Sequence, residues 1–425
     1  MITEMDANRF ATRSLQELRI LRILSAAIDA VDPYIAVQNN LPALEGRVFG
    51  LGIGKAAIPM MDALAERVSL AGGLAVTKFA PRGAATAYTL IEGGHPIPDA
   101  RSLYAGEKVL EFVSSLQEED TLCCLISGGG SALVTAPYIP LEDLQRLTSL
   151  LLASGARVDE INTLRRQLDR VKGGGVARAT KAKIISFILS DVIGNPLEAI
   201  ASGPTFADPT KSEEAISILK KYDLEKAVPD SILDALLNHR KIVTEDGGRS
   251  ANGVRNIIIG DNELASRTAL KQAEVEGFQA EILMNDLQAE AREAGRMFSQ
   301  KFRDELKQRP RPFCLIAGGE TTVTVKGQGK GGRNQELALS AVNELRGLDD
   351  VLLIALATDG DDGPTDAAGA VVTGESAQRA ELLGLDAADY LSRNDAYSFF
   401  QALGDLMKTG PTGTNVNDLI FLFAT

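Results

Sequence analysis

The chain has 425 residues, 45% of them hydrophobic and 24% charged, which is the composition of a folded globular protein with about two or three domains. Its net charge of −13 disfavours non-specific binding to nucleic acid or to an anionic membrane. No apolar run approaches the ~20 residues that span a bilayer, and the first residues lack the basic and apolar regions of a secretion signal. We therefore expect no nucleic-acid and no membrane partner.

Three cysteines, Cys123, Cys124 and Cys314, lie in apolar segments. An adjacent pair plus one distant residue suits neither a disulfide framework nor a zinc site. The pattern predicts buried thiols in a reducing compartment, and we expect a cytoplasmic protein.

The first predicted element is a helix. Ser14 to Glu17 has the pattern of a capping box, and apolar residues follow on one helical face as far as Val31. Short apolar runs, separated by helical stretches, then predict strands at 47–53, 73–77, 88–91, 121–126 and 183–189. This alternation is typical of a mostly parallel sheet with helices on both faces.

A polar stretch at 240–252 is the predicted linker. Beyond it we expect strands at 256–260, 279–284, 313–317, 321–325, 351–356 and 419–423, and helices at 262–276, 287–307 and 333–346 with two or three more before the last strand. The sequence therefore predicts two α/β domains, residues 1–240 and 253–425, with the active site in a cleft between them.

The first glycine loop, Gly50 to Lys55, ends a strand and begins a helix. Gly52 to Ala57 satisfies the G-x-G-x-x-A pattern of dinucleotide sites, but Lys78 stands near where an acidic residue would meet the ribose. The P-loop pattern fails as well, because its spacing is one residue short and Ala56 replaces Ser or Thr. What remains is a helix N-terminus beside a lysine, which favours anion binding, with tight strand–helix packing as the alternative.

The second loop, Ser127 to Ser131, follows another apolar run. It is not a nucleophile elbow, because Leu133 stands where that pattern requires glycine. With His95 and His239 the only histidines, a serine triad would depend on His95 alone. Backbone N–H groups and two hydroxyls suit a carboxylate or phosphate better than a hydrolase site.

His95 lies at the centre of the turn Glu92 to Asp99. Substrate contact and a hydrogen bond within the turn are both open for it. No second His or Cys is spaced to complete a transition-metal site.

Several carboxylates directly follow predicted strands or glycine pairs, where α/β sheets hold their ligands. They are Asp191, Glu320, Asp359, Asp361, Asp362 and Asp366. Gathered acids repel one another unless a cation lies between them, so the set predicts Mg²⁺. The alternative is a series of solvated turns and helix caps.

A third loop, Lys326 to Glu336, is rich in glycine and basic residues and opens a helix. Backbone N–H groups, the helix dipole and the Arg333 guanidinium converge there, which suits a phosphoryl group in transfer. A mobile surface loop is the alternative. Together, the anion sites and the carboxylates predict a kinase-like transferase with a small anionic substrate.

These motifs resemble the glycerate kinases that carry a MOFRL C-terminal domain, usually glycerate 2-kinases. The resemblance runs over nearly the whole chain, and its most specific parts are Gly331–Glu336, Ala357–Gly360, Gly363–Asp366 and Gly410–Asp418. It implies a Rossmann-like, mostly parallel N-terminal sheet and a C-terminal α/β domain of the MOFRL type. It also implies ATP-dependent phosphorylation of D-glycerate, typically at the 2-hydroxyl, with Mg²⁺ or another divalent cation.

Together with the reading of the loops, the resemblance suggests roles for site residues. Lys55 and Arg333 are central to activity in the family, and Asp191 is our candidate for orienting or deprotonating the substrate hydroxyl, with metal binding as its alternative role. The expected substrate contacts are His95, Ser127, Gly128, Gly129 and Ser131. The expected ATP contacts are Gly52, Gly54, Lys330, Gly331, Gly332, Asn334, Thr358 and Thr365, and the expected metal ligands are Glu320, Asp359 and Asp366.

One departure from the family lies at Leu164 to Asp169, a helix in which the family often has a Lys and a Ser, so substrate contacts from it are left open. A homodimer is left open as well. The alternative functions are phosphorylation of the 3-hydroxyl, NAD(P)H-dependent hydroxypyruvate reduction and non-catalytic binding of a sugar acid. The missing ribose acid at the first loop speaks against the reductase.

Overall fold

The computed structural model describes residues 7–80, 87–245 and 253–425. Contacts divide it into two compact units. One unit is Pro33–Ile259, and the other combines the described residues up to Asp32 with Gly260–Thr425. The units differ from the expected division into 1–240 and 253–425 because the N-terminal helix packs with the second half of the chain.

The Pro33–Ile259 unit is built on a six-stranded sheet with the order β3-β2-β1-β4-β5-β6. Its strands are β1 (Val48–Ile53), β2 (Leu70–Thr77), β3 (Thr89–Glu92), β4 (Thr121–Ile126), β5 (Lys183–Leu189) and β6 (Val254–Gly260). The pairs β1–β2, β1–β4, β2–β3 and β4–β5 are parallel, which confirms the expected mostly parallel sheet. The final strand, β6, was expected in the second domain but lies at the edge of this sheet.

The order of the strands reverses between β1 and β4. From β1 the chain builds β2 and β3 on one side, and it then crosses back to add β4, β5 and β6 on the other. All six residues of β4 are buried, as expected for a central parallel strand made of a continuous apolar run. In open α/β sheets, the point of reversal is where ligands bind, outside the carboxyl ends of the strands.

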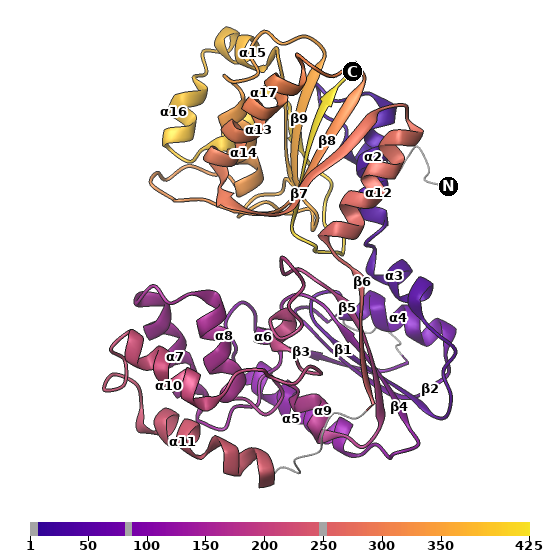
Figure 1. Cartoon of the computed structure of the whole chain (residues 1–425), viewed down its shortest axis with the longest axis vertical. Coiled ribbons are helices and arrows are strands. Elements are labelled where there is room, and N and C mark those ends of the chain that lie inside the picture. Colours follow the sequence, from indigo (N-terminus) through magenta and orange to yellow (C-terminus); the bar gives the residue numbers. More distant parts are fainter. Residues whose placement is uncertain (1–6, 81–86, 246–252) are drawn as a thin grey trace. The chain divides into compact units, whose positions relative to one another are not determined.

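Helices cover both faces of this sheet (Figure 1). On one face lie α3 (Pro33–Asn40) and α4 (Ala57–Arg67), and on the other α5 (Ala100–Ser114) and α9 (Gly175–Ala179). The short helix α6 (Gly130–Leu133) directly follows the second glycine loop, and a 3₁₀ turn, η2, spans Ile200–Ser202.

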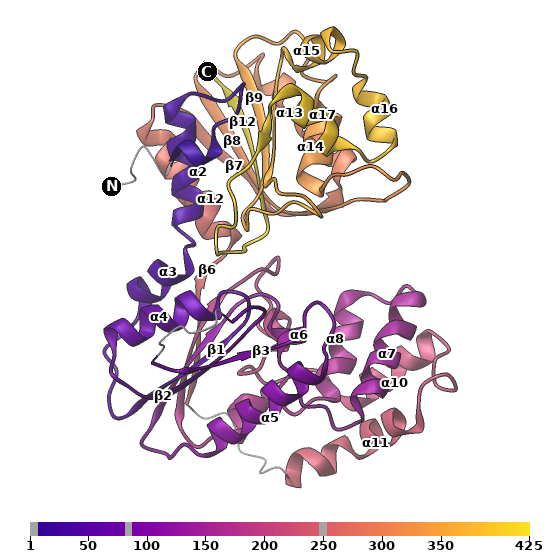
Figure 2. The same cartoon turned by 180° about the vertical axis from the view of Figure 1, so that it is seen from behind.

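Four further helices form a layer with an apolar core of their own, visible from both sides in Figures 1 and 2. They are α7 (Leu141–Ala153), α8 (Val158–Gln167), α10 (Ser212–Lys221) and α11 (Asp230–Glu245). The predicted linker at 240–252 therefore begins inside α11, and its remainder at 246–252 lies outside the described residues.

The other unit contains a mixed sheet with the order β11-β10-β9-β12-β8-β7. Its strands are β7 (Gln279–Glu290), β8 (Phe313–Thr322), β9 (Val351–Ala357), β10 (Gly369–Thr373), β11 (Leu406–Met407) and β12 (Asp418–Ala424). The last strand of the chain, β12, is inserted between β8 and β9 and runs antiparallel to both.

The helices of this unit are η1 (Asn8–Phe10), α2 (Leu18–Asp29), α12 (Asn262–Val275), α13 (Ala291–Glu305), α14 (Arg333–Ala341), α15 (Ser376–Leu382), α16 (Ala387–Ser392) and α17 (Ala396–Leu403). On one face of the sheet, α13 and α14 contribute to the main core. On the other face, α2 packs against α12. Arg22 of α2 makes two contacts with Glu276, at 2.7 and 2.6 Å.

Three local predictions were wrong. Where strands were expected at 313–317 and 321–325, a single strand, β8, ends at Thr322, and β7 continues to Glu290 where a helix was expected. The capping box at Ser14 does not form, because α2 begins at Leu18 without a side-chain cap. The Ser14 hydroxyl donates instead to Asp405, at 2.9 Å, so a distant partner overrides the local pattern.

The three cysteines are free and buried, as predicted. Burial raises the pKa of the Cys123 thiol to about 12, so it stays protonated at neutral pH. Among the described residues, no helix combines the length and the apolar character needed to cross a membrane.

Candidate active site

The first two glycine loops meet at the reversal point of the parallel sheet. One leaves the carboxyl end of β1 and the other leaves the carboxyl end of the neighbouring β4. The Ser127 N–H donates to the Ile53 carbonyl at 2.9 Å, and the Lys55 N–H donates to the Gly128 carbonyl at 2.9 Å. The two loops are therefore hydrogen-bonded to each other, which holds both in one place.

Gly54 allows this close approach. Its φ of +129° disfavours any L side chain, and a Cβ there would lie 2.2 Å from the Ser127 Oγ. The buried Ser127 Oγ in turn accepts the Ala56 N–H at 3.0 Å, so Ser127 caps α4. The predicted anion site at this helix end thus has fewer free donors than expected, because the N–H groups of Lys55, Ala56 and Ala57 all bond to protein oxygens.

The Lys55 side chain is the remaining cationic group of this loop. It is exposed and makes no hydrogen bond or ion pair with any described residue. Contact with an anion at the first loop would therefore come from the Lys55 ammonium.

Two other predicted residues approach the second loop. A Cβ at Gly128 would lie 2.2 Å from Asp191 Oδ2, so this carboxylate rests against the glycine. At Gly129, where φ is +84°, a Cβ would lie 3.2 Å from Lys55 Cγ and 3.3 Å from His95 Nε2. Lys55, His95 and Asp191 come from different strand ends, and the fold gathers all three around this loop.

The surroundings of His95 favour the neutral imidazole. Burial, followed by the positive charges of Lys55 and Lys78, lowers its pKa below 6.5. A neutral imidazole carries one donor and one acceptor nitrogen, so it can accept a hydrogen bond from a substrate hydroxyl.

Ser131, at the end of the second loop, contacts a residue that the sequence did not single out. Its Oγ lies 2.7 Å from the Oγ of the buried Ser202. Ala201 and Ser202 have φ values of +49° and +61°, which are unfavourable for residues other than glycine. Such backbone strain clusters at functional sites. No local sequence pattern marks this contact, because Ser131 and Ser202 are 71 residues apart in the chain.

In the other unit, Arg333 begins α14 and is held by two carboxylates. Its Nε and Nη2 lie 2.5 and 3.0 Å from the carboxylate oxygens of Asp418, and its Nη1 lies 2.7 Å from Glu320. Burial disfavours the charge, but Asp418 and then Glu320 more than compensate and raise the pKa of Arg333. Asp418, which was given no role from sequence, is the main partner of the predicted catalytic arginine.

The N-terminus of α14 is capped by Asp362. Its carboxylate accepts the backbone N–H groups of Asn334 at 3.1 Å and Gln335 at 2.9 Å. Gly332 permits this approach, since a Cβ there would lie 2.2 Å from Asp362 Cγ. The helix end predicted to bind a phosphoryl group is therefore closed by a carboxylate of the protein.

The Lys326–Gly332 loop is held by the residues before α17. Asn394 Oδ1 accepts the N–H groups of Lys326 and Gly327 at 2.8 and 2.9 Å, and Asp395 accepts that of Lys330 at 3.1 Å. The Lys330 ammonium lies 3.9 Å from the centre of the Tyr397 ring. These contacts argue against the alternative of a mobile surface loop.

Two of the predicted ATP contacts, Thr358 and Thr365, have structural hydrogen bonds. The buried Thr358 hydroxyl donates to the Asn417 carbonyl at 2.7 Å and accepts the Val416 N–H at 2.8 Å. Thr365 Oγ1 donates to the Asp362 carbonyl and accepts from Gln335 Nε2, both at 2.9 Å. Both threonines therefore organise the loops around β9 and α14.

The three predicted metal ligands also have protein partners. Glu320 pairs with Arg333, and Asp359 accepts the Asp361 N–H at 3.1 Å. Asp366 accepts from Tyr397 at 2.6 Å and Lys408 at 3.0 Å, and these hydrogen bonds lower its pKa to about 2. In the part of the chain that the structure describes, no three His, Cys, Asp or Glu side chains are grouped to hold a metal. These residues do not form a ready three-carboxylate Mg²⁺ site.

A domain of unknown function (DUF4147) matches residues 19–237, and the MOFRL family matches residues 313–418. The D-glycerate 2-kinase of Thermotoga maritima is 43% identical over 421 residues, which cover 97% of this chain and 99% of that protein. The chain belongs to the glycerate kinase family.

Two further comparisons agree. The glycerate 2-kinase of Pyrococcus horikoshii is 40% identical over 426 residues, with 95% of this chain and 96% of that protein covered. The crystal structure of the glycerate kinase of Thermotoga maritima matches with a TM-score of 0.89 at 42% identity, covering 95% of this chain and 98% of that one. They confirm the predicted family and the predicted α/β fold.

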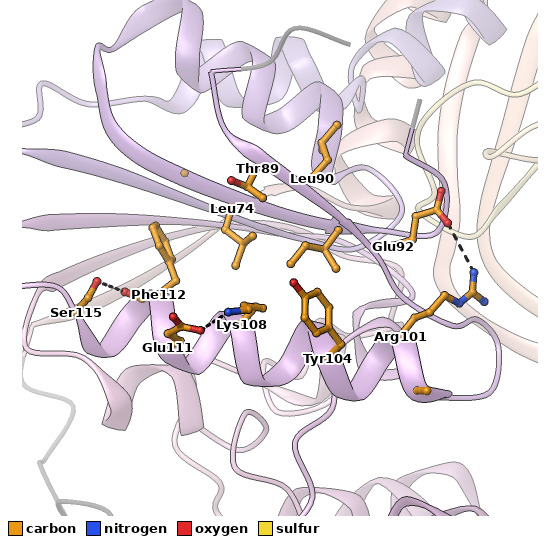
Figure 3. Close-up of a pocket in the computed structure, with 13 residues that line it drawn as sticks. Leu74, Thr89, Leu90, Glu92, Arg101, Tyr104, Lys108, Glu111, Phe112 and Ser115 are labelled. Carbon is orange, nitrogen blue, oxygen red and sulfur yellow. Dashed lines mark hydrogen bonds and ion pairs between the residues drawn. The ribbon is translucent and has the colours of Figure 1, made fainter. Parts of the chain in front are cut away.

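A groove of ≈ 870 Å³ lies elsewhere in this glycerate kinase family member, between β3 and α5 (Figure 3). None of the predicted site residues lines it. Its charged side chains are paired, Lys108 with Glu111 at 2.6 Å and Arg101 with Glu92 at 3.7 Å. With no uncompensated charge to bind an anion, this groove is a poor candidate, and we place the candidate active site at the glycine loops.

Proposed function

We propose that the protein transfers a phosphoryl group from ATP to D-glycerate, at the 2-hydroxyl, to give 2-phospho-D-glycerate. The observation that carries the proposal is the grouping of Lys55, His95 and Asp191 around the Ser127–Ser131 loop at the reversal point of the parallel sheet. A cation, a neutral imidazole and a carboxylate at one loop can bind an acid and handle the proton of its hydroxyl. The names of the relatives support the same reaction.

In this proposal the hydroxy acid binds at the Ser127–Ser131 loop. Asp191 orients or deprotonates the 2-hydroxyl, and neutral His95 accepts a second hydrogen bond from the substrate. Lys55, which has no partner among the described residues, stabilises the negative charge that develops during transfer. This electrostatic contribution dominates, because phosphoryl transfer is catalysed mainly by positioning and charge.

The phosphates of ATP are assigned to the side chains of Lys330 and Arg333, because Asp362 already accepts the backbone N–H groups at the start of α14. Asp418 takes the Nε and one Nη2 N–H of Arg333 and Glu320 lies at Nη1, so a phosphate oxygen would be bound by the Nη1 and Nη2 N–H groups that remain. A divalent cation is proposed to accompany ATP, bound chiefly by phosphate oxygens and water, as is usual for Mg²⁺. The buried free thiols fit an enzyme of the reducing cytoplasm.

The NAD(P)H-dependent alternative has weaker support. A ribose-binding acid is expected after the second strand of a dinucleotide fold, whereas β2 ends at Thr77 and is followed by Lys78. A lysine ammonium carries donors only and cannot accept the hydrogen bonds of two ribose hydroxyls.

The test is a coupled assay with D-glycerate, ATP and Mg²⁺. The product passes directly to enolase and pyruvate kinase, with phosphoglycerate mutase left out. Pyruvate above the blanks without glycerate or without protein is the expected result, since enolase accepts only the 2-phosphate. Pyruvate that forms only after mutase is added would assign transfer to the 3-hydroxyl.

No pyruvate in either arrangement, while added 2-phosphoglycerate and ADP still give pyruvate, would contradict the proposal. Omitting Mg²⁺ and adding EDTA tests the metal requirement. In this arm ADP formation is measured by chromatography, because the coupling enzymes also need Mg²⁺. Oxidation of NADPH by hydroxypyruvate would then favour the reductase.

A further inference from the structure

A second cavity, of ≈ 330 Å³, opens beside the Ser127–Ser131 loop. Its walls come from α7, α8 and the turn after His95, and Ser131 of the second loop is one of its lining residues. The volume lies at the lower end of the range for small-molecule pockets, about 300–1,000 Å³. Apolar side chains such as Ile97 and Leu144 form part of the wall, which lowers the local dielectric and strengthens any charge interaction inside.

Two of the three charged residues that line this cavity neutralise each other. Lys172 Nζ lies 2.7 Å from Asp169 Oδ2, and both side chains are buried. Asp169 also accepts the Thr135 hydroxyl and the Val171 N–H, the latter at 2.9 Å, and Lys172 donates to the Val134 carbonyl at 3.0 Å. This pair has its partners within the protein and offers little to a ligand.

The third charged residue, Arg165, has no such partner. Within the described ranges its guanidinium makes no hydrogen bond and no ion pair, and it interacts with Asp169 only beyond hydrogen-bond distance. Its neighbour Arg166 points elsewhere and pairs with Asp208 at 2.9 Å. Arg165 is partly buried and stays charged at any ordinary pH. The cavity therefore carries one uncompensated positive charge in a chain whose net charge is −13.

We infer that Arg165 binds the carboxylate of the acceptor substrate in this cavity and thereby selects a hydroxy acid over a neutral polyol. The inference rests on the proposed function and adds a group for the carboxylate of the acid, since Lys55 at the Ser127–Ser131 loop is assigned to the charge that develops during transfer. A guanidinium and a carboxylate pair through two parallel hydrogen bonds, which also fixes the orientation of the acid. Ser131 lines the same cavity and belongs to the loop against which Asp191 and His95 lie, so the cavity adjoins the loop that carries the reacting groups.

The test compares Arg165→Gln with wild type in the coupled assay. We expect the KM for D-glycerate to rise on the order of 10- to 100-fold, because a charge-assisted hydrogen bond pair is lost, while the KM for ATP changes less than about twofold. The preference for D-glycerate over glycerol, which has the same carbon chain without the carboxylate, should fall by a similar factor. Arg165→Lys keeps the charge and should restore part of the affinity.

The matched control is Arg157→Gln. Arg157 directly precedes the same helix, α8, is exposed and pairs with Asp159 at 2.6 Å, so its replacement should leave both KM values unchanged. If Arg165→Gln does not fold, Thr148→Glu serves instead, since it puts a carboxylate into the same cavity and should likewise raise the KM for D-glycerate.

Calorimetric titration with D-glycerate in the absence of ATP separates this inference from the proposed function. An active wild type together with an unchanged KM and unchanged binding in Arg165→Gln would overturn the role of Arg165 and leave the kinase assignment intact. A wild type that makes no phosphoglycerate would contradict the kinase. In that case, glycerate binding by wild type that disappears in Arg165→Gln would still support the carboxylate site. The site would be overturned if wild type does not bind glycerate, or if Arg165→Gln binds it equally well.

Discussion

Arg333 and Asp418 form a two-contact ion pair, with Nε 2.5 Å from Oδ2 and Nη2 3.0 Å from Oδ1. Asp418 begins β12, the strand inserted between β8 and β9, and only 2% of its side chain is exposed. The Arg333 side chain is 32% exposed and also pairs with Glu320. The central strand of the sheet thus holds the guanidinium in one orientation while part of it remains open to a ligand.

Replacing Asp418 with Asn removes the main counter-charge of Arg333. We expect kcat to fall about 10- to 100-fold, because the guanidinium is no longer held where transition-state charge develops. The KM for D-glycerate should change by less than about twofold. The free energy of unfolding should drop by about 1–3 kcal/mol, since the buried Asp418 carboxylate no longer accepts the charged hydrogen bonds of Arg333. Glu320 still pairs with Arg333, which limits the loss. Steady-state kinetics and urea unfolding measure both effects.

The control for Asp418→Asn is Asp389→Asn. Asp389 pairs with Arg393 at 2.9 Å on an exposed helix, so its loss should change neither quantity by a measurable amount. A wild-type kcat in Asp418→Asn would show that Arg333 does not need this partner.

Lys55→Ala tests the exposed ammonium at the first loop. We expect kcat to fall on the order of 10²- to 10³-fold, as for the loss of one donor to a developing charge. Stability should hardly change, because the Lys55 side chain has no hydrogen bond or ion pair to lose within the described structure. Lys78→Ala is the matched control, since Lys78 is also exposed and also contributes to the low pKa of His95. Equal effects of the two substitutions would deny Lys55 a specific role.

Gly128→Ala should act through Asp191. The added Cβ would lie 2.2 Å from Asp191 Oδ2, and because this is the end of a flexible side chain, the carboxylate moves rather than the backbone. We expect at least about a tenfold loss of kcat, and a double-mutant cycle with Asp191→Ala provides the check. If the glycine substitution works by displacing Asp191, it adds little once that carboxylate is gone. A full additional loss in the double variant would point to a different cause.

Asp362 makes stability depend on pH. Burial and then the charge of Asp418 raise its pKa to about 7, against the hydrogen bonds from Gln335 and Asn334. Between pH 4 and 7 the unfolded chain has this carboxyl ionised while the folded protein keeps it protonated. The contribution of Asp362 to stability is therefore complete below about pH 4 and declines as pH rises towards 7, by on the order of a few kcal/mol.

The comparison of wild type with Asp362→Asn isolates this effect. Urea unfolding at pH 5, 6, 7 and 8 gives the free energy of unfolding of both proteins. The value for the variant minus that for wild type should increase as pH rises to about 7. Titrating groups that do not interact with Asp362 cancel in the difference. Parallel pH profiles for the two proteins would contradict the raised pKa.

Much of the first sheet was predictable from local patterns. Strands such as β4 are buried along their whole length, so they appear in the sequence as continuous apolar runs, and the glycine loops after them mark where the chain turns. The positions of Lys55, Asp191 and the Ser127–Ser131 loop at strand ends followed from the same alternation. In a parallel sheet, the carboxyl ends of neighbouring strands lie along one edge.

The sequence by itself determined the parallel sheet, the glycine loops and the family, because each of these depends on patterns of residues that are contiguous in the chain. Only the tertiary structure decided which donors those loops leave free. Ser127 caps α4, Asp362 caps α14 and Asp418 pairs with Arg333, in each case through a hydrogen bond to a residue far away in the chain. Such partners depend on strand order and on the insertion of β12, and no local periodicity encodes either. For the same reason, only the folded chain distinguishes Arg165, whose charge faces a cavity, from Arg166 beside it, which has its carboxylate.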